Sequence, residues 1–298
     1  MLLDCAIIGG GPAGLSASLV LARAKKNIIL FDENKPRNAV THESHGFITR
    51  DGIQPLEFKR IAKQDLEKYL TLSIENQRVI DIKKENKFFM IYTDDGSSYR
   101  SRKVILATGL QDVLPEIAGV QEFYGTSLFI CPFCDGWELR DRRLVVIADN
   151  DRAMHLTKMV SNWSSDLVVC TNGKQVFSKE EKQLLENKNI QVVEYEIEAL
   201  HGENGYLRKV RFINGIEIER EGGFVAGELK QASSLAKTLG CSMTEMGGIE
   251  TDDFGRTNIE GVYASGDTTF SMPQLIVAAS EGSKVAAGVV SDLINEDF

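Results

Sequence analysis

A glycine-rich turn near the N-terminus constrains the fold more than any other feature of the sequence. An apolar run at residues 5–8 predicts a strand, residues 9–14 read Gly-Gly-Gly-Pro-Ala-Gly, and the apolar spacing that follows predicts a helix. In such a unit Gly9 permits the turn, Gly11 lets the backbone approach a pyrophosphate, and Gly14 lets the helix pack closely on the strand. The pattern therefore predicts a dinucleotide-binding unit whose ligand phosphates lie at the helix N-terminus.

An acidic residue after the next predicted strand strengthens this interpretation. Residues 27–31 read Asn-Ile-Ile-Leu-Phe and end directly before Asp32, where a carboxylate can accept hydrogen bonds from ribose hydroxyls. The polar stretch that follows contains Asn38 and His45, which could touch the same ligand. A solvated loop histidine is the alternative for His45.

Two further segments join a predicted strand to residues that suit a bound ligand. Residues 103–106 predict a buried strand that runs into the small side chains of residues 107–109, which allow a ligand close to the backbone. The strand predicted at 262–264 leads to Gly266 and Asp267, and Asp267 suits a hydrogen bond to a sugar-alcohol chain. The final predicted helix begins near Gln274. The expected cofactor contacts are Gly9, Gly11, Pro12, Ala13, Gly14, Asp32, Asn38, His45, Ala107, Thr108, Gly109, Gly266, Asp267, Gln274 and Leu275.

The middle of the chain contains a pair of closely spaced cysteines that we interpret as the reaction centre. Residues 131–136 read Cys-Pro-Phe-Cys-Asp-Gly, so two thiols can close a short reversible disulfide. Pro132 fits the first position of a helical turn, which places Cys131 at the cap and Cys134 just inside. A helix N-terminus can lower a thiol pKa from about 8.5 to roughly 3.5–7.5, and the thiolate is the reactive form. Asp135 could transfer protons if burial raises its pKa.

Two other interpretations of the cysteine pair are available. A zinc site would need two more ligands at similar spacing, whereas Cys5, Cys170 and Cys241 stand singly. Alternatively, both cysteines could be unreactive core residues, since free cysteine is often buried. The Asp-Gly that follows the pair favours a turn near solvent instead.

The spacing of the first nucleotide unit recurs later in the chain, but its ligand-binding residues do not. Residues 145–169 again predict a strand, a turn, a helix and a strand. The positions that correspond to Gly9, Gly11, Gly14 and Asp32 are occupied by Ala148, Asn150, Ala153 and Thr171.

These replacements predict that the second unit keeps its fold but binds NADPH weakly or not at all. Side chains at 148 and 150 block the close approach of backbone to pyrophosphate. Asp149 and Asp151 add negative charge, and each contact with a phosphate would cost about 4 kcal/mol at an effective dielectric constant of about 20. Lys174 is the one cation where a 2′-phosphate would be held.

The length and the repeat together predict the fold class. A chain of 298 residues, 43% of them hydrophobic, can form about two domains with a core each. We expect an α/β protein with two Rossmann-like three-layer nucleotide-binding domains, the second inserted into the first. The expected boundaries are 1–114 and 247–298 for the first domain and 115–246 for the insert, which carries the cysteine pair.

Charge and the N-terminal residues restrict the partners and the location. The net charge of −9 disfavours a surface that binds nucleic acid or anionic membrane. The first residues enter a predicted strand at once and form neither a basic leader nor a long apolar run, so we expect a cytoplasmic protein without a membrane segment. The few cysteines do not suggest a disulfide framework.

With these motifs assembled, the chain resembles low-molecular-weight thioredoxin reductases from end to end. The resemblance rests on residues 9–14, 107–109, 131–136 and 261–267 and on Gln274, in family order and at family spacing. It implies that the first unit binds FAD and that the protein is a homodimer. It also implies that Cys134 lies nearer the flavin, that Cys131 attacks the substrate disulfide, and that Asp135 is the acid and base. The implied partner is a thioredoxin-like protein or a small dithiol or disulfide.

Two departures from the family pattern bear on the electron donor. They are Pro132-Phe133 inside the motif and the lost NADPH signature. Similar losses occur in ferredoxin-dependent flavin thioredoxin reductases and in dithiol oxidases that pass electrons through FAD to oxygen. Asp135 matches the reductases, whereas Pro132-Phe133 and Trp137-Glu138 are closer to the oxidases. We therefore expect a flavin-dependent thiol/disulfide oxidoreductase with a donor such as ferredoxin or flavodoxin; the alternatives are a dithiol oxidase and a non-enzymatic redox sensor.

Overall fold

The computed structural model describes residues 2–298, which form two compact units. The first unit contains residues 2–39, 46–111 and 230–298, and the second contains residues 40–45 and 112–229. The second unit thus interrupts the first in the sequence. The expected α/β chain with one nucleotide-binding fold inserted into another is confirmed.

The first unit is built on a mainly parallel sheet in the order β3-β2-β1-β6-β5-β4, with β17 also paired to β6. The strands are β1 (Leu2–Ile8), β2 (Ile28–Phe31), β3 (Leu72–Glu75), β4 (Val79–Glu85), β5 (Phe88–Thr93), β6 (Ser98–Leu106) and β17 (Val262–Ala264). Four pairs are parallel: β3 with β2, β2 with β1, β1 with β6, and β6 with β17. The pairs β6 with β5 and β5 with β4 are antiparallel. The carboxyl ends of β2, β1, β6 and β17 therefore lie along one edge of the sheet.

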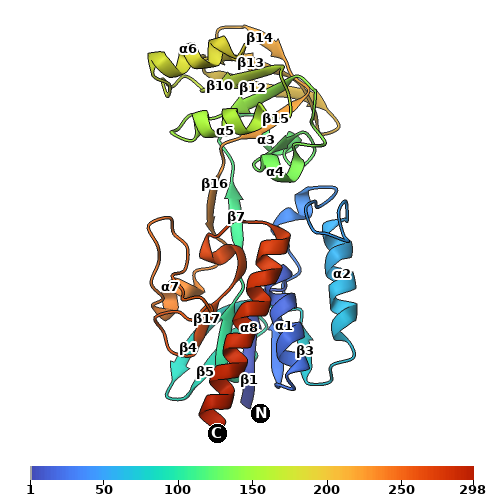
Figure 1. Ribbon diagram of the computed structural model, residues 1–298, viewed down its shortest axis with the longest axis vertical. Helices are drawn as coiled ribbons and strands as arrows, with labels where there is room; N and C mark the ends of the chain where they lie inside the picture. The colour runs from blue at the N-terminus through green and yellow to red at the C-terminus, as the bar shows by residue number, and fades with distance from the viewer. Residues whose placement is uncertain (1) are drawn as a thin grey trace. The chain divides into compact units, whose positions relative to one another are not determined.

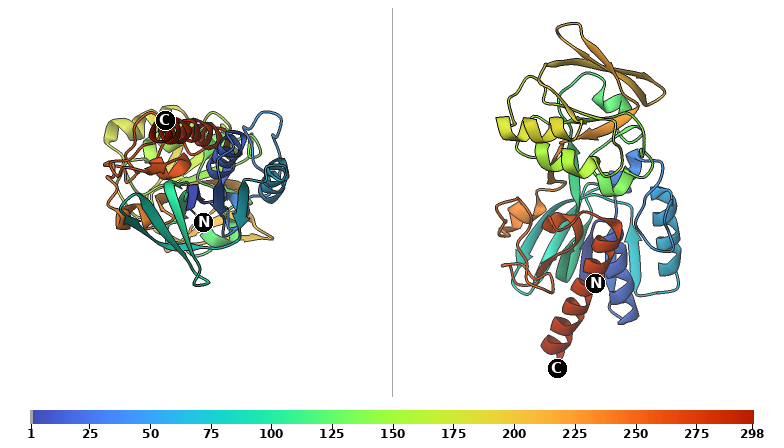
Figure 2. Two further views of the ribbon diagram at one scale, coloured as in Figure 1. Left: turned by 90° about the horizontal axis from the view of Figure 1, so that it is seen from below. Right: turned by 45° about the horizontal axis from the view of Figure 1, so that its top comes forward.

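Side chains alternate along β1 and so supply cores on both faces of this sheet. Cys5 and Ile7 belong to the cluster that helices α1 and α8 cover. Ala6 and Ile8 face the other way and pack with α7 and the β4–β5 hairpin. Figures 1 and 2 show α8 in red beside α1 in dark blue. The helical segments of this unit are α1 (Pro12–Arg23), α2 (Pro55–Leu66), α7 (Leu235–Leu239) and α8 (Leu275–Asp297), with 3-10 turns η1 (Arg37–Val40) and η2 (Gly266–Thr269).

The second unit has a parallel sheet in the order β11-β10-β9-β15-β8 and a separate antiparallel sheet β12-β13-β14. Its strands are β8 (Leu128–Phe129), β9 (Leu144–Ile147), β10 (Leu167–Cys170), β11 (Gln191–Val193), β12 (Ile197–Glu203), β13 (Tyr206–Phe212), β14 (Glu217–Glu219) and β15 (Gly222–Val225). Val145 and Ile147 of β9 pack toward β12 and β13. Leu144 and Val146 pack toward helices α5 and α6, which completes a three-layer arrangement.

Short helices connect these strands. They are α3 (Val120–Phe123), α4 (Pro132–Asp135), α5 (Ala153–Val160) and α6 (Lys179–Asn187). The start of α6 is fixed by a capping box, in which the Ser178 hydroxyl accepts from the Glu181 N–H and the Glu181 carboxylate accepts from the Ser178 N–H. The start of α4 is fixed by Pro132 at its first position.

The chain passes between the units in two paired strands, β7 (Leu110–Val113) and β16 (Glu228–Gln231). The units divide after residues 111 and 229, whereas the sequence placed these boundaries after 114 and 246. Residues 230–246 return early to the first unit because Leu235 and Ala236 of α7 fill its core. Residues 40–45, which the sequence placed in the first domain, belong to the second unit.

Candidate active site

The cysteine pair of the second unit forms a disulfide at the start of α4. Cys131 and Cys134 are joined with their Cα atoms 5.3 Å apart. Cys131 is the N-cap in an extended conformation, and its carbonyl accepts hydrogen bonds from the N–H groups of Cys134 (3.1 Å) and Asp135 (3.2 Å). The expected pairing is present, and the proline at the first helical position accounts for the cap geometry.

The remaining cysteines differ from this pair in burial and in thiol acidity. Cys5, Cys170 and Cys241 are buried and free, whereas both members of the pair are partly exposed. Burial raises the pKa of all three free thiols, that of Cys170 to about 12, so their reactive thiolates are disfavoured. Among residues 2–298, no group of three or more His, Cys, Asp and Glu side chains is placed to hold a metal ion.

Asp135 closes α4 and lies beside the cysteine pair with a pKa near neutrality. Burial is the main cause that raises the pKa of Asp135 to about 7, and the negative charge of Glu138 raises it further. The positive charge of His45 acts in the opposite direction. A carboxyl group with this pKa can both donate and accept a proton near pH 7, as acid and base catalysis requires.

His45 lies in the second unit, within a group of carboxylates. Its Nε2 is 3.6 Å from Oε1 of Glu138 and 3.7 Å from Oε2 of Glu43. The other expected cofactor residues belong to the first unit. A contact between His45 and a cofactor stays a prediction. The sequence did not reveal that Glu43 and Glu138 are neighbours of His45. Glu138 could have been noticed because it follows Asp135 by three residues.

Aromatic side chains are exposed next to the disulfide. Phe133 and Trp137 are 58% and 64% exposed, which is unusual for side chains of this size. The ring of Phe133 contacts Trp163 edge to face, at 5.9 Å between centroids. The guanidinium of Arg140 lies 4.1 Å from the ring centroid of Trp137. Phe133 on α4 and Trp137 in the turn that follows therefore present exposed aromatic side chains close in sequence to the disulfide.

The expected cofactor residues of the first unit follow the carboxyl ends of four parallel strands. The turn at 9–14 follows β1, Asp32 follows β2, residues 107–109 follow β6, and Gly266 comes shortly after β17. Gln274 is the N-cap of α8 and Leu275 its first residue. Ligands of open parallel sheets bind outside this edge, where the strand ends converge.

The glycine turn has the shape of a pyrophosphate cradle. A Cβ on Gly11 would meet no atom within 4 Å, so space lies open in front of the backbone there. A Cβ on Gly14 would overlap the carbonyl oxygen of Gly9, so this position must stay glycine for α1 to pack. Pro12 and Ala13 form the first turn of α1, whose N-cap Gly11 provides no side-chain cap. The N–H groups of this turn are suited to an anionic ligand.

Asp32 lies in a buried ion-pair group that the sequence did not reveal. Its carboxylate oxygens are 3.0 Å from Nζ of Lys59 and 2.8 Å from Nζ of Lys63. Burial alone would raise the pKa of Asp32, but the two ammonium groups outweigh it and hold the pKa below its usual value. The four-residue spacing of the two lysines on α2 was the available signal.

Asp267 is also paired, with Arg37 of η1. The distance from Nη2 of Arg37 to Oδ2 of Asp267 is 3.1 Å. The N–H of Gly266 donates to the Glu281 carboxylate (2.9 Å), which ties η2 to α8. Ser265 Oγ is buried and has no hydrogen-bond partner among the described residues. An orphaned hydroxyl beside Gly266, together with the open space at Gly11, fits a polar ligand along this edge.

The second nucleotide unit contains an internal ion pair at its altered turn. Nζ of Lys174 is 2.7 Å from Oδ2 of Asp149. Thr171 Oγ1 donates to the Lys174 carbonyl, and the guanidinium of Arg152 donates to the Gly227 carbonyl. The cation expected near a 2′-phosphate is therefore already paired with a carboxylate of this unit.

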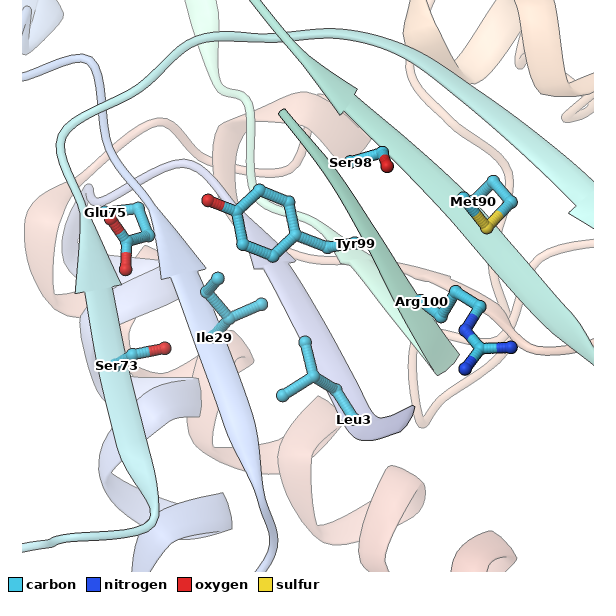
Figure 3. A pocket seen from close by; sticks show the side chains of 8 residues that line it. All are labelled: Leu3, Ile29, Ser73, Glu75, Met90, Ser98, Tyr99 and Arg100. Atoms are coloured by element: carbon cyan, nitrogen blue, oxygen red, sulfur yellow. The ribbon is translucent and has the colours of Figure 1, made fainter. Parts of the chain in front are cut away.

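A surface cavity of the first unit contains none of the expected site residues. It has a volume of about 360 Å³ and lies over the sheet, as Figure 3 shows. It is lined by Leu3, Ile29, Ser73, Glu75, Met90, Ser98, Tyr99 and Arg100.

None of the helices within residues 2–298 has both the length and the apolar character to cross a membrane.

Comparison with known proteins gives consistent matches over nearly the whole chain. The family model described as pyridine nucleotide-disulphide oxidoreductase matches residues 3–282. A Bacillus anthracis crystal structure, described as a candidate thioredoxin reductase TrxB, is 48% identical with a TM-score of 0.96, covering 99% of this chain and 100% of that one. Thioredoxin reductase aclD of Aspergillus oryzae is 29% identical, covering 98% of this chain and 96% of the relative. Thioredoxin reductase of Helicobacter pylori is 28% identical, covering 98% and 99%.

The raised pKa of Asp135 should make stability depend on pH. Its pKa is 3.8 as a free group and about 7 in the folded protein, so between these values the folded chain holds a proton that the unfolded chain releases. The free energy of unfolding should therefore fall as pH rises through this window, by up to about 4 kcal/mol. Urea unfolding of the wild type and of Asp135→Asn at several pH values measures this contribution, and equal pH slopes in the two proteins would contradict it.

Proposed function

Because the chain belongs to the pyridine nucleotide-disulphide oxidoreductase family and is a thioredoxin reductase-like enzyme of low molecular weight, we propose that it passes electrons between FAD and the Cys131–Cys134 disulfide. From this pair the electrons go to the disulfide of a thioredoxin-like protein. The observation that carries the proposal is the partly exposed disulfide at the cap of α4, next to a carboxyl group with a pKa of about 7. The names of the Aspergillus and Helicobacter relatives support this substrate class.

The thiol chemistry follows from the positions of the three residues. Cys131 gives its proton to Asp135 and attacks one sulfur of the substrate disulfide as a thiolate, and a mixed disulfide forms while the substrate S–S bond breaks. The departing sulfur takes that proton from Asp135. Cys134 then gives its proton to Asp135 and attacks the Cys131 sulfur as a thiolate. The mixed disulfide breaks, the Cys131–Cys134 disulfide closes, and the second substrate sulfur leaves and takes the proton from Asp135. The pair loses two electrons and two protons, and the substrate becomes a dithiol.

The cofactor role belongs to the residues at the strand ends of the first unit. The family implies FAD, which when bound supplies a two-electron carrier for the cysteine pair. The backbone at Gly11 and the first N–H groups of α1 would bind its pyrophosphate. Asp32 and Asp267 would accept hydrogen bonds from its hydroxyls, and the charged partners of each hold its carboxylate in place.

We propose that the electrons come from a protein donor and not from NADPH bound to the second unit. Side chains replace glycine at 148 and 150, and Lys174 is already paired with Asp149 of the same turn. NADPH would have to break this pair and face an unscreened carboxylate. A small iron–sulfur or flavin protein, of the ferredoxin or flavodoxin type, delivers electrons without this site.

We also propose that the protein is a homodimer, as its resemblance to the family implies.

A dithiol oxidase is the second candidate, favoured by the apolar surface beside the disulfide. Phe133 and Trp137 are largely exposed there and could hold a small apolar dithiol. In that direction the substrate dithiol loses two electrons and two protons, which pass through the cysteine pair and the flavin to oxygen. A redox sensor would instead exchange electrons slowly with every donor.

The cofactor assignment predicts a difference between two glycine variants. Gly11→Val should retain the fold, because its side chain enters open space, but should lose FAD, because the side chain blocks the pyrophosphate. Gly14→Ala should fail to fold normally, because its Cβ would overlap a backbone carbonyl. Circular dichroism and the visible flavin absorbance of the purified proteins distinguish the two. Full flavin content in Gly11→Val would refute the assigned cradle.

The thiol roles predict an asymmetric trap. Cys134→Ser should leave Cys131 able to form a stable mixed disulfide, because no second thiol remains to resolve it. Cys131→Ser is the matched control and should trap little. The probe is a thioredoxin that lacks its own resolving cysteine, and mass spectrometry identifies the linked residue. Trapping mainly through Cys134 would reverse the roles, and trapping through neither would contradict the proposed function.

The altered second unit predicts that NADPH and NADH reduce the protein poorly. Lost backbone donors and two acidic side chains should leave binding in the millimolar range or weaker. Calorimetry measures the affinity, and anaerobic rapid mixing with each nucleotide, reduced ferredoxin or dithiothreitol follows flavin bleaching. Fast bleaching by ferredoxin supports the reductase, fast bleaching by dithiol with oxygen turnover supports the oxidase, and slow bleaching by all supports a sensor. Micromolar NADPH binding with reduction at tens per second would overturn the prediction.

A further inference from the structure

The two lysines that contact Asp32 differ in burial and in the oxygen that each of them contacts. The side chain of Lys59 is 6% exposed, whereas that of Lys63 is 31% exposed. Nζ of Lys59 donates to Oδ1 of Asp32 (3.0 Å), and Nζ of Lys63 lies 2.8 Å from Oδ2. Both lysines can reach one carboxylate because side chains four residues apart on α2 are neighbours.

The two carboxylate oxygens of Asp32 therefore have different surroundings. Oδ1 also accepts from the N–H of Asn34 (3.0 Å), so it has two hydrogen bonds. Oδ2 is buried and makes no hydrogen bond among the described residues, because its ion-pair contact with Lys63 lacks the alignment of one. A buried carboxylate oxygen without a hydrogen bond is rare, and it marks Oδ2 as the oxygen that gains most from a ligand donor.

Asp32 also lies directly against the glycine turn. A Cβ added at Gly10 would come within 2.3 Å of Cγ of Asp32, so the carboxyl group touches the backbone of the turn. A dinucleotide whose pyrophosphate lies at this turn would direct its adjoining ribose hydroxyls to Asp32. Lys63 covers Oδ2, and its partly exposed side chain is free to move into water.

We propose that the two lysines act on FAD binding in opposite directions: Lys59 is a positioning residue that fixes Asp32, and Lys63 competes with the ribose hydroxyls for Oδ2. The inference rests on the proposed function, since it concerns the FAD site assigned to the first unit. Lys63 neutralises the buried carboxylate until hydroxyl donors replace it. Lys59 stays on Oδ1 throughout, because separating two buried charges is costly.

A purely structural ion-pair group would behave differently. If both lysines were only counter-ions of Asp32, loss of either ammonium would disturb the carboxylate and weaken FAD binding. General attraction between a cation and the ligand phosphates would act in the same direction. Only competition for Oδ2 makes FAD bind more tightly when Lys63 is removed, so the sign of that change distinguishes the two cases.

The test is a titration of the full-length protein, stripped of its flavin, with FAD, followed by the change in flavin fluorescence. Lys63→Met removes the ammonium but keeps the length of the side chain, and it should lower the Kd about three- to tenfold. Lys59→Met should raise the Kd by about tenfold or more, because Asp32 loses its buried partner.

The matched control is Arg60→Met on the same helix. It removes the same charge from α2, but Arg60 pairs with the exposed Glu57 and not with Asp32. This variant should change the Kd for FAD by less than about twofold. It therefore corrects for any effect of net charge on the binding of an anionic ligand.

A second titration tests whether the ribose hydroxyls are the groups that displace Lys63. ADP and 2′,3′-dideoxy-ADP share the adenine and the pyrophosphate, but only ADP carries both ribose hydroxyls. Lys63→Met should tighten the binding of ADP about three- to tenfold and leave that of dideoxy-ADP nearly unchanged. Equal effects on the two nucleotides would overturn the inference.

The remaining outcomes separate this inference from the proposed function. Tighter FAD binding in Lys63→Met, weaker binding in Lys59→Met and no change in Arg60→Met support the inference. An unchanged or raised Kd in Lys63→Met overturns it, and this variant decides alone if Lys59→Met does not fold. A wild-type protein that takes up no FAD would contradict the proposed function itself, whereas normal uptake by the wild type with the wrong sign in Lys63→Met would contradict only this inference.

Discussion

Strand β6 joins parts of the first unit that lie far apart in the sequence, and the cofactor edge depends on its pairing. On one side β6 pairs in parallel with β1 over most of its length. On the other side its first residues pair with β5 and its last, Val104 to Leu106, with β17. Because β17 comes after the entire inserted unit, this pairing closes the first unit around the insertion. It also aligns the segments that follow β1, β6 and β17 at one edge, where a single ligand can contact all of them.

Two partly or fully buried aspartates show how the local charges decide the chemistry of a carboxyl group. Asp32 is nearly inaccessible, yet Lys59 and Lys63 hold its pKa below the usual value. Asp135 has no such partner in α4, and burial together with Glu138 raises its pKa to about 7. The first group is therefore ionised near pH 7, where it can only accept hydrogen bonds. The second can carry a proton at pH 7, as exchange with thiols requires.

The second nucleotide unit has a nucleotide-binding fold, but its turn lacks the glycines found in the turn of the first unit. The parallel sheet around β9 keeps buried apolar residues on both faces, and these depend on packing rather than on a bound dinucleotide. The turn after β9 has Ala148, Asn150 and Ala153 in place of glycines and contains a carboxylate paired with Lys174. Packing therefore preserves the domain that carries the disulfide, while its own dinucleotide turn has changed.

The sequence by itself determined the two nucleotide units and the cysteine pair, because each depends on local signals. A glycine turn between an apolar strand and a helix, and two thiols around a proline, are recognised from spacing alone. Only the tertiary structure decided the early return of the chain at residue 230, because the apolar side chains of α7 are needed in a distant core. It alone also paired Arg37 with Asp267 and brought His45 to Glu138. These contacts join residues widely separated in sequence, and no local pattern encodes which charges meet once the sheets have formed.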